Sequence, residues 1–185
     1  MADFSQEELK LFATEVNGEV SDRPMCGIID VKIRGFYQTI DNGHWNTAAE
    51  YLREDAKLVA DLAMPGSIHE NTNSVVDYYR ARYYRLKRTV IKLLVIDRGR
   101  ATCSLESFWL VDKHRCDVPA MKATTLMRQR EVCVIDLDEN HLIKRIEYRD
   151  TSERISVTKG SRKKMNHAVA ESEKDVVVMM EHFGY

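Results

Sequence analysis

The chain has 185 residues, of which 44% are hydrophobic and 31% are charged, as is usual for one globular domain with short extensions. Its 28 basic and 29 acidic residues leave a formal net charge of -1, which excludes a general electrostatic attraction to nucleic acid or to an anionic membrane. No apolar run approaches the ~20 residues of a membrane-spanning helix. The start Met1–Glu8 is acidic and lacks the features of a signal peptide. We therefore expect a cytoplasmic protein with no membrane partner.

Helical spacing dominates the first part of the chain. Residues 1–20 are predicted to form a short helical arm that ends at Asn17-Gly18. A longer helix begins near Ser21–Pro24, where a capping residue precedes a proline. Asn42-Gly43 ends it, because both residues tolerate a left-handed backbone. The apolar stripe of this helix contains Ile29, Ile33, Phe36, Tyr37 and Ile40.

Two shorter helices and a strand follow. Residues 46–52 are predicted to be helical, and Lys57–Asp61 to form a short strand before a turn at Met64–Ser67. A third helix begins near Asn73 or Ser74. Its predicted apolar face contains Val75, Tyr79, Tyr83 and Leu86.

From Val90 onwards the hydrophobic period changes to two, which predicts strands. The predicted strands span residues 90–96, 101–111, 120–137 and 142–148, with turns at 98–99 and 138–141. The third of these is too long for one flat strand, and its alternation slips near Arg130-Glu131. We interpret that slip as a β-bulge that bends the sheet.

Residues 153–185 have a different character from the strands before them. Thr158–Lys164 is polar and basic, which is typical of a linker. Val176, Met179, Met180 and Phe183 then recur at helical spacing. This pattern predicts an amphipathic C-terminal helix, either docked on the domain or making a dimer contact.

Helices followed by strands indicate an α+β fold. We expect a cone-shaped α+β barrel over residues 21–152, in which a curved antiparallel sheet carries three helices on its concave face. Such a cone would enclose a cavity for a small molecule.

Cysteines and motifs give no sign of a metal or another cofactor. Cys26, Cys103, Cys116 and Cys133 are widely spaced, as expected for reduced cysteines. His114 and Cys116 offer two ligands, but nothing nearby completes a metal site. The chain has no Gly-rich phosphate loop, nucleophile elbow or metal-binding helix motif. We therefore expect cofactor-independent chemistry, if the protein is an enzyme.

The order of several short segments resembles one superfamily. These segments are Phe36-Tyr37 with Ile40–Trp45, Leu52 with Asp55–Leu58, Ile68-His69 with Val75–Arg80, and Asp138–Asn140 with Ile143 and Ile146. Together they resemble the nuclear transport factor 2-like superfamily, in its SnoaL-like and ketosteroid isomerase-like branch. The resemblance covers most of residues 25–150, and implies the cone-shaped fold and a homodimer. Members include isomerases, dehydratases, cyclases and epoxide hydrolases, and also binding modules without chemistry, so the fold does not select the function.

The isomerase's functional residues carry over only in part. Its oxyanion-donating tyrosine falls on Phe36, which has no donor, while Tyr37 is turned about 100° away along the helix. Its protonated aspartic acid falls near Cys133, a weaker donor. Its general base falls on Ala60 or Asp61, and a supporting tyrosine is retained as Tyr79.

Four residues are catalytic candidates under this resemblance. Asp61 is the candidate base, and His69, Tyr37 and Glu131 are candidate acids or donors. The alternatives are that Asp61 is a solvated residue at a strand end and that His69 is an ordinary surface histidine. The bulge would decide whether Glu131 faces the cavity. The predicted substrate-binding residues are Phe36, Asp41, Trp45, Tyr79, Tyr83, Met127 and Cys133.

Two functions remain open at this point. The first is a SnoaL-like enzyme that transfers a proton within a small, apolar, oxygenated substrate, and the second is a dimeric, non-catalytic module that binds a ligand or a protein. Nucleic-acid binding is disfavoured. The cations and aromatic rings of Tyr78–Arg88 divide between a core face and a solvated flank if this segment is helical.

Overall fold

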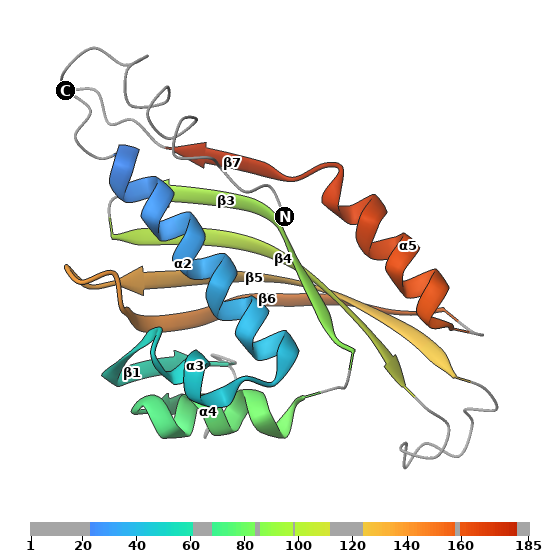
Figure 1. Ribbon diagram of the computed structural model, residues 1–185, viewed down its shortest axis with the longest axis horizontal. Coiled ribbons are helices and arrows are strands. Elements are labelled where there is room, and N and C mark those ends of the chain that lie inside the picture. Colours follow the sequence, from blue (N-terminus) through green and yellow to red (C-terminus); the bar gives the residue numbers. More distant parts are fainter. Residues whose placement is uncertain are drawn as a thin grey trace.

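The computed structural model describes residues 23–60, 68–83, 86–97, 99–111, 124–157 and 160–180. A single bent sheet is crossed on one face by a long helix, with two shorter helices beside it (Figure 1). The helices are α2 (Arg23–Asn42), α3 (Trp45–Ala49), α4 (Thr72–Ala81) and α5 (Arg162–Glu173). The strands are β1 (Leu52–Val59), β2 (Ile68–Glu70), β3 (Arg88–Asp97), β4 (Arg100–Val111), β5 (Thr125–Leu137), β6 (Ile143–Val157) and β7 (Val177–Met180).

The sheet has seven strands in the order β2-β1-β6-β5-β4-β3-β7. Strands β3 to β6 form an antiparallel meander, and β1 pairs with β2 in the same sense. Two pairs are parallel, β1 with β6 and β3 with β7. The predicted α+β cone fold is therefore confirmed, but the sheet is mixed and not antiparallel throughout.

The longest helix forms where its apolar stripe predicts it. Ile29, Ile33, Phe36, Tyr37 and Ile40 are all at most 3% exposed, which places the stripe of α2 against the sheet. Gly43 ends the helix with φ 71°, and its N–H donates to the carbonyl of Ile40 at 3.1 Å. This is the left-handed cap that Asn42-Gly43 predicts.

The two faces of the sheet are set by alternation along β4 and β5. Ala101, Cys103 and Leu105 belong to the core under α2, and their register partners on β5 are Ile135, Cys133 and Glu131. The residues between them face the other way, because strand side chains alternate. On that outer face Phe108 packs against α5.

The irregularity near Arg130-Glu131 is in the neighbouring strand. The β4–β5 register is unbroken over the whole of β5, so Met127, Gln129, Glu131 and Cys133 share the concave face. The β5–β6 register shifts between Arg130 and Cys133. Cys133 pairs with Tyr148 while Val132 pairs with Asp150, so the extra residues belong to β6. The predicted bulge is thus at the expected place along the sheet, but it is in β6, whereas the prediction put it in β5.

The C-terminal part differs from the prediction. Strand β6 continues through residue 157, the helix is Arg162–Glu173, and the predicted helix at 176–183 contains strand β7 instead. Two physical reasons explain the error. The helix has a narrow apolar stripe, made by Met165, Ala168 and Val169, whereas the Val-rich run at 176–178 has β-branched side chains that favour a strand.

The last helix is held on the outer face by an apolar cluster and a buried carboxylate. Met165 packs with Val90, Phe108 and Leu126, and we call these four residues the docking cluster. Ser172 donates to Glu106 at 2.6 Å, and Arg128 and Arg130 also bind this carboxylate. Burial opposes ionisation of Glu106, but the hydrogen bonds from Ser172 and the two arginines lower its pKa below the usual value.

A glycine allows the chain to turn closely into α5. A Cβ on Gly160 would collide with the backbone of Leu126, and the Gly160 N–H donates to the carbonyl of Thr124 at 2.7 Å. Ser161 then caps the helix by accepting from the N–H of Lys164 at 3.2 Å.

Some predictions lie outside the described residues. They are the helical arm at 1–20, the turn at 64–67, the start of the strand predicted at 120–137, and Asp61. In the part of the chain that the structure describes, no helix combines the length and apolarity needed to cross a bilayer.

We expect Met165→Ala to lower the free energy of unfolding by about 2–5 kcal/mol, because it leaves a cavity in the docking cluster. Met165 is 2% exposed. The matched control is Asn166→Ala, one position along the same helix at an exposed site, which should change stability by no more than about 0.5 kcal/mol. Urea denaturation followed by circular dichroism measures both. Equal stability of the two variants would contradict the docking of α5.

Candidate functional site

Three tyrosine hydroxyl groups meet inside the cone, each from a different element. Tyr79 on α4 lies 3.1 Å from Tyr148 on β6, between hydroxyl oxygens. Tyr37 on α2 lies 3.4 Å from the same Tyr148 oxygen and 3.4 Å from the sulfur of Cys133 on β5. We call Tyr37, Tyr79, Tyr148 and Cys133 the hydroxyl cluster. It joins helices α2 and α4 to strands β5 and β6.

Burial controls the acid–base properties of this cluster. Tyr37, Tyr79 and Tyr148 are 3%, 5% and 6% exposed, and loss of solvent raises the pKa of each well above 10. The neighbouring acidic groups add to this effect. The hydroxyl groups therefore remain protonated at neutral pH and can act only as hydrogen-bond donors and acceptors.

The cluster includes one residue that sequence reasoning missed. Tyr148 makes contact with both other tyrosines, yet it was predicted only as the end of a strand. Its signal was the alternation Ile146, Tyr148, which places the ring on the inner face. Phe36 is also inside, with its ring edge-on to those of Tyr37 and Tyr79 at 5.4 and 5.6 Å. Phe36 and Tyr37, which are adjacent on α2, thus both point into the core.

Glu131 lies on the concave face, one inward position beyond Cys133 on β5. Gln129 donates to its carboxylate at 3.1 Å. Burial is the largest cause of the raised pKa values of Tyr78, Tyr79 and Tyr148, and the negative charge of Glu131 raises them further. The carboxylate therefore lies within electrostatic range of the hydroxyl cluster, and a potential base faces potential donors here.

A line of polar groups extends from Glu131 toward the end of α2. The Thr89 hydroxyl donates to Asp41 at 3.0 Å and lies 3.2 Å from the Ser107 hydroxyl. Ser107 is the register partner of Gln129, so their side chains are neighbours on the inner face. We call Asp41, Thr89, Ser107, Gln129 and Glu131 the polar belt.

Asp41 serves as the anchor of this belt. It is 6% exposed and accepts hydrogen bonds from both the N–H and the hydroxyl of Thr89. Burial raises its pKa, against the lowering effects of Lys87 and Thr89. Both donors belong to Thr89 of β3, 48 positions further along the chain, so the local sequence around Asp41 does not identify them.

His69 is half-buried on β2, next to the hydroxyl cluster but not in it. Its Nδ1 lies 3.5 Å from the Ser74 hydroxyl, and its ring lies 5.0 Å from that of Tyr78. Tyr78 in turn packs edge-on against Tyr79 at 5.2 Å. His69 therefore reaches the cluster only through aromatic neighbours.

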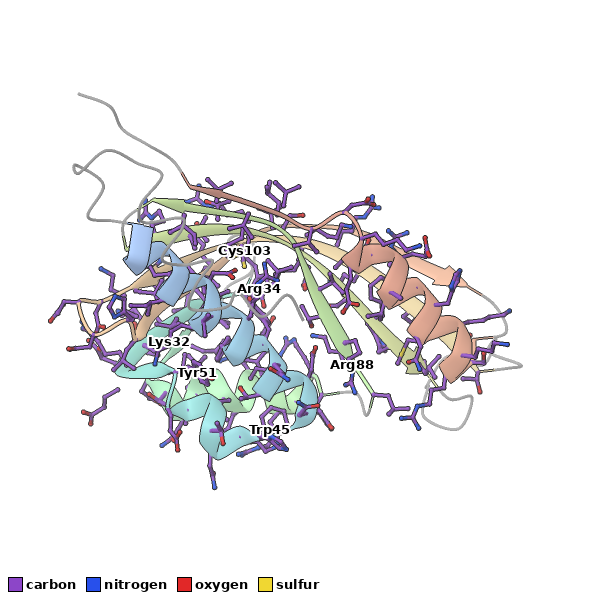
Figure 2. The ribbon with its side chains drawn as sticks, turned by 45° about the horizontal axis from the view of Figure 1, so that its top comes forward. Lys32, Arg34, Trp45, Tyr51, Arg88 and Cys103 are labelled. Carbon is purple, nitrogen blue, oxygen red and sulfur yellow. The ribbon has the colours of Figure 1, made fainter. Side chains whose placement is uncertain are left out.

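The remaining predicted binding residues lie further away. Trp45 packs against Tyr83 at 5.2 Å between ring centres, and lies beside the C-terminal end of α2, away from Cys103 (Figure 2). Met127 shares the inner face with Trp109, its register partner on β4. Asp61 is outside the described residues. Within the described ranges, no group of three His, Cys, Asp or Glu side chains is placed to hold a metal ion.

Comparisons of the sequence with known proteins find nothing. No family model matches the chain, and no curated protein is significantly similar to it. Solved structures do match. One match is SalBIII, an epoxide hydrolase/cyclase-like enzyme with a role in pyran ring formation in salinomycin. Its structure superposes on this chain with a TM-score of 0.54 and 12% sequence identity, over 66% of this chain and 89% of that one.

Two further solved structures show the same arrangement. A Δ5-3-ketosteroid isomerase from Mycobacterium sp. has a TM-score of 0.51 and 8% identity, over 70% of this chain and 98% of that one. A computationally designed 17-OHP binder has a TM-score of 0.50 and 7% identity, over 69% and 94%. At such identities the likeness concerns the fold alone. The chain therefore shares its cone-shaped fold with these proteins, as the resemblance of its short segments predicts.

Proposed function

We propose that the protein is a cofactor-independent enzyme that moves a proton within a small, largely apolar, oxygenated molecule held against the concave face. The observation that carries this proposal is the position of Glu131 on the inner face of β5, within electrostatic range of Tyr79 and Tyr148. A carboxylate opposite hydroxyl donors is suited to removing a proton beside a carbonyl while the oxygen is stabilised.

In the proposed reaction Glu131 accepts a proton from the carbon next to a carbonyl group. A tyrosine hydroxyl of the cluster donates a hydrogen bond to the carbonyl oxygen as negative charge develops there. Return of the proton from Glu131 to a different atom completes an isomerisation. Asp61 is retained as a second proposed base and His69 as a proposed donor at the edge of the cluster.

The setting of these groups supports an apolar ligand. Opposite Glu131 and onward along the inner face past Cys133, β4 and β5 carry the apolar core residues Leu105, Cys103 and Ile135. The polar belt begins at the level of Glu131 and Gln129. A ligand with an apolar body and one or two oxygen atoms matches this division. The names of the similar enzymes, one for ring formation and one for ketosteroid isomerisation, agree with such a ligand but belong to those proteins.

The test is hydrogen–deuterium exchange next to a carbonyl, followed by proton NMR in D2O with 2-decalone, a bicyclic apolar ketone. We expect Glu131→Gln to slow protein-dependent exchange by about 10²–10⁴-fold, as is typical for the loss of a general base. Glu54→Gln, at an exposed carboxylate on β1, is the matched control and should retain full activity. No exchange above buffer with the unaltered protein would contradict the enzyme proposal. Loss of exchange in Asp61→Asn alone would move the role of base to Asp61.

A non-catalytic binding module is the second candidate, and one observation favours it. The three hydroxyl groups and Cys133 already bond to one another, and Phe36 occupies the position where the resemblance puts the donor tyrosine. Intrinsic fluorescence separates the two functions. In a Trp45→Phe variant Trp109, on the inner face, is the remaining reporter, since the chain has 2 tryptophans. A saturable signal with 2-decalone but without deuterium exchange would indicate binding only.

The hydroxyl cluster also predicts a response to alkaline pH. Because its tyrosines ionise well above pH 10 in the native protein and near pH 10 when unfolded, their contribution to stability is complete below pH 10. It is lost as the pH rises through the folded-state values. We therefore expect tyrosinate absorbance to rise in two stages, the later one together with unfolding. Tyr148→Phe should reduce the later stage, and a single stage near pH 10 would contradict a closed cluster.

We further propose that the protein forms a homodimer, as the resemblance implies. Helix α5 contacts the outer face over β3 and β4, so a second copy on that face would meet β5 and β6. Light scattering coupled to size-exclusion chromatography should then give twice the chain mass of 21.4 kDa. A constant mass of one chain at all concentrations would contradict the dimer.

A further inference from the structure

Two cysteines face each other across the central strands. Cys103 on β4 and Cys133 on β5 are register partners in an unbroken antiparallel pair. Such partners point to the same side of the sheet, with Cα atoms about 4.5–5.5 Å apart. That separation lies inside the range of about 4.4–6.8 Å that a disulfide bridges. Both thiols are free and fully buried.

The two sulfur atoms already interact. A hydrogen bond with Cys133, together with burial, raises the pKa of the Cys103 thiol. Figure 2 shows Cys103 in the strand layer close to α2, on the side of Arg34. The neighbours of this thiol include the ion pair of Arg34 and Asp30 on α2, joined at 2.8 Å. The pair therefore lies within electrostatic range of charged groups of the covering helix.

Cys133 also belongs to the hydroxyl cluster. Its sulfur lies 3.4 Å from the hydroxyl oxygen of Tyr37, which is 3.4 Å from that of Tyr148. Any chemical change at Cys133 therefore alters the surroundings of the Tyr37 hydroxyl group. This connection does not depend on whether the protein is an enzyme.

We propose that Cys103 and Cys133 are a site of reversible disulfide formation with a peroxide as the oxidant, and that the bond rearranges the hydroxyl cluster. One sulfur attacks a peroxide oxygen as its thiol proton passes to the leaving oxygen, which breaks the O–O bond and gives a sulfenic acid and water. The second thiol attacks that sulfur, forming the S–S bond and releasing a second water. Each cysteine loses one electron, and hydrogen peroxide gains two. The two thiol protons leave in the water.

Oxidation changes what Cys133 offers to Tyr37. The disulfide has no S–H group, and an S–S distance of about 2.0 Å draws the Cys133 sulfur toward Cys103. The Tyr37 hydroxyl then keeps Tyr148 as its partner in the cluster. We therefore expect a change in the tyrosine environment that accompanies the covalent bond.

The experiment oxidises the native full-length protein with hydrogen peroxide and identifies the linked peptides by mass spectrometry. The chain has 4 cysteines, so a Cys26→Ser/Cys116→Ser variant isolates the pair. We expect a loss of two hydrogen masses, a peptide joining Cys103 to Cys133, and full reversal by dithiothreitol. The thermal midpoint should rise by about 5–10 °C, because the bond closes a loop of about 30 residues.

Matched variants test the connection to the tyrosines. Near-ultraviolet circular dichroism should change on oxidation in the Cys26→Ser/Cys116→Ser protein, and should not change when Cys103→Ser is added. Tyr37→Phe should reduce the change in circular dichroism on oxidation, while the Cys103–Cys133 disulfide still forms. Peptide mapping of the unaltered protein decides the site even if a variant does not fold. Oxidation that stops at sulfenic or sulfinic acid, or a cross-link that forms only in urea, would overturn the proposal.

Discussion

The packing of α2 across the bent sheet is the interaction on which the rest of this structure depends. Its apolar stripe is buried from Ile29 to Ile40. Burial of such a stripe removes a large apolar area from water, which is the dominant favourable contribution to folding. It also takes Tyr37 out of water, and a buried hydroxyl group needs partners. Tyr148 and Cys133 provide them from the strands.

The two faces of the central strands carry different chemistry. On the inner face, Cys133 and Glu131 follow one another along β5, and an apolar base changes into a polar belt. On the outer face, Arg128 and Arg130 of the same strand bind the buried carboxylate of Glu106, which also accepts a hydrogen bond from Ser172 of α5. A single strand can serve both faces because its side chains alternate. The candidate site and the docked C-terminal helix are therefore placed by alternating residues of the same strand, β5.

The site differs from that implied by the resemblance to the isomerase. Phe36 removes one donor and Cys133 replaces an acid with a thiol, yet Tyr37, Tyr79 and Tyr148 bring hydroxyl groups to the same interior. The potential base that the structure describes is Glu131, on the central sheet. A carboxylate and hydroxyl groups are therefore present on the inner face, in an arrangement different from the one that the resemblance implies. The dithiol beneath them adds chemistry that the isomerase comparison does not contain.

The sequence by itself determined the helical stripe of α2, the Gly43 cap, the hairpins and the α+β class, because these follow from local periodicity and turn residues. Only the tertiary structure decided which strand bulges, that residues 162–173 form the last helix, and that Thr89 is the partner of Asp41. It also showed that Tyr148 joins the two other tyrosines. These features depend on register and on contacts between residues far apart in the chain, which a local pattern does not specify.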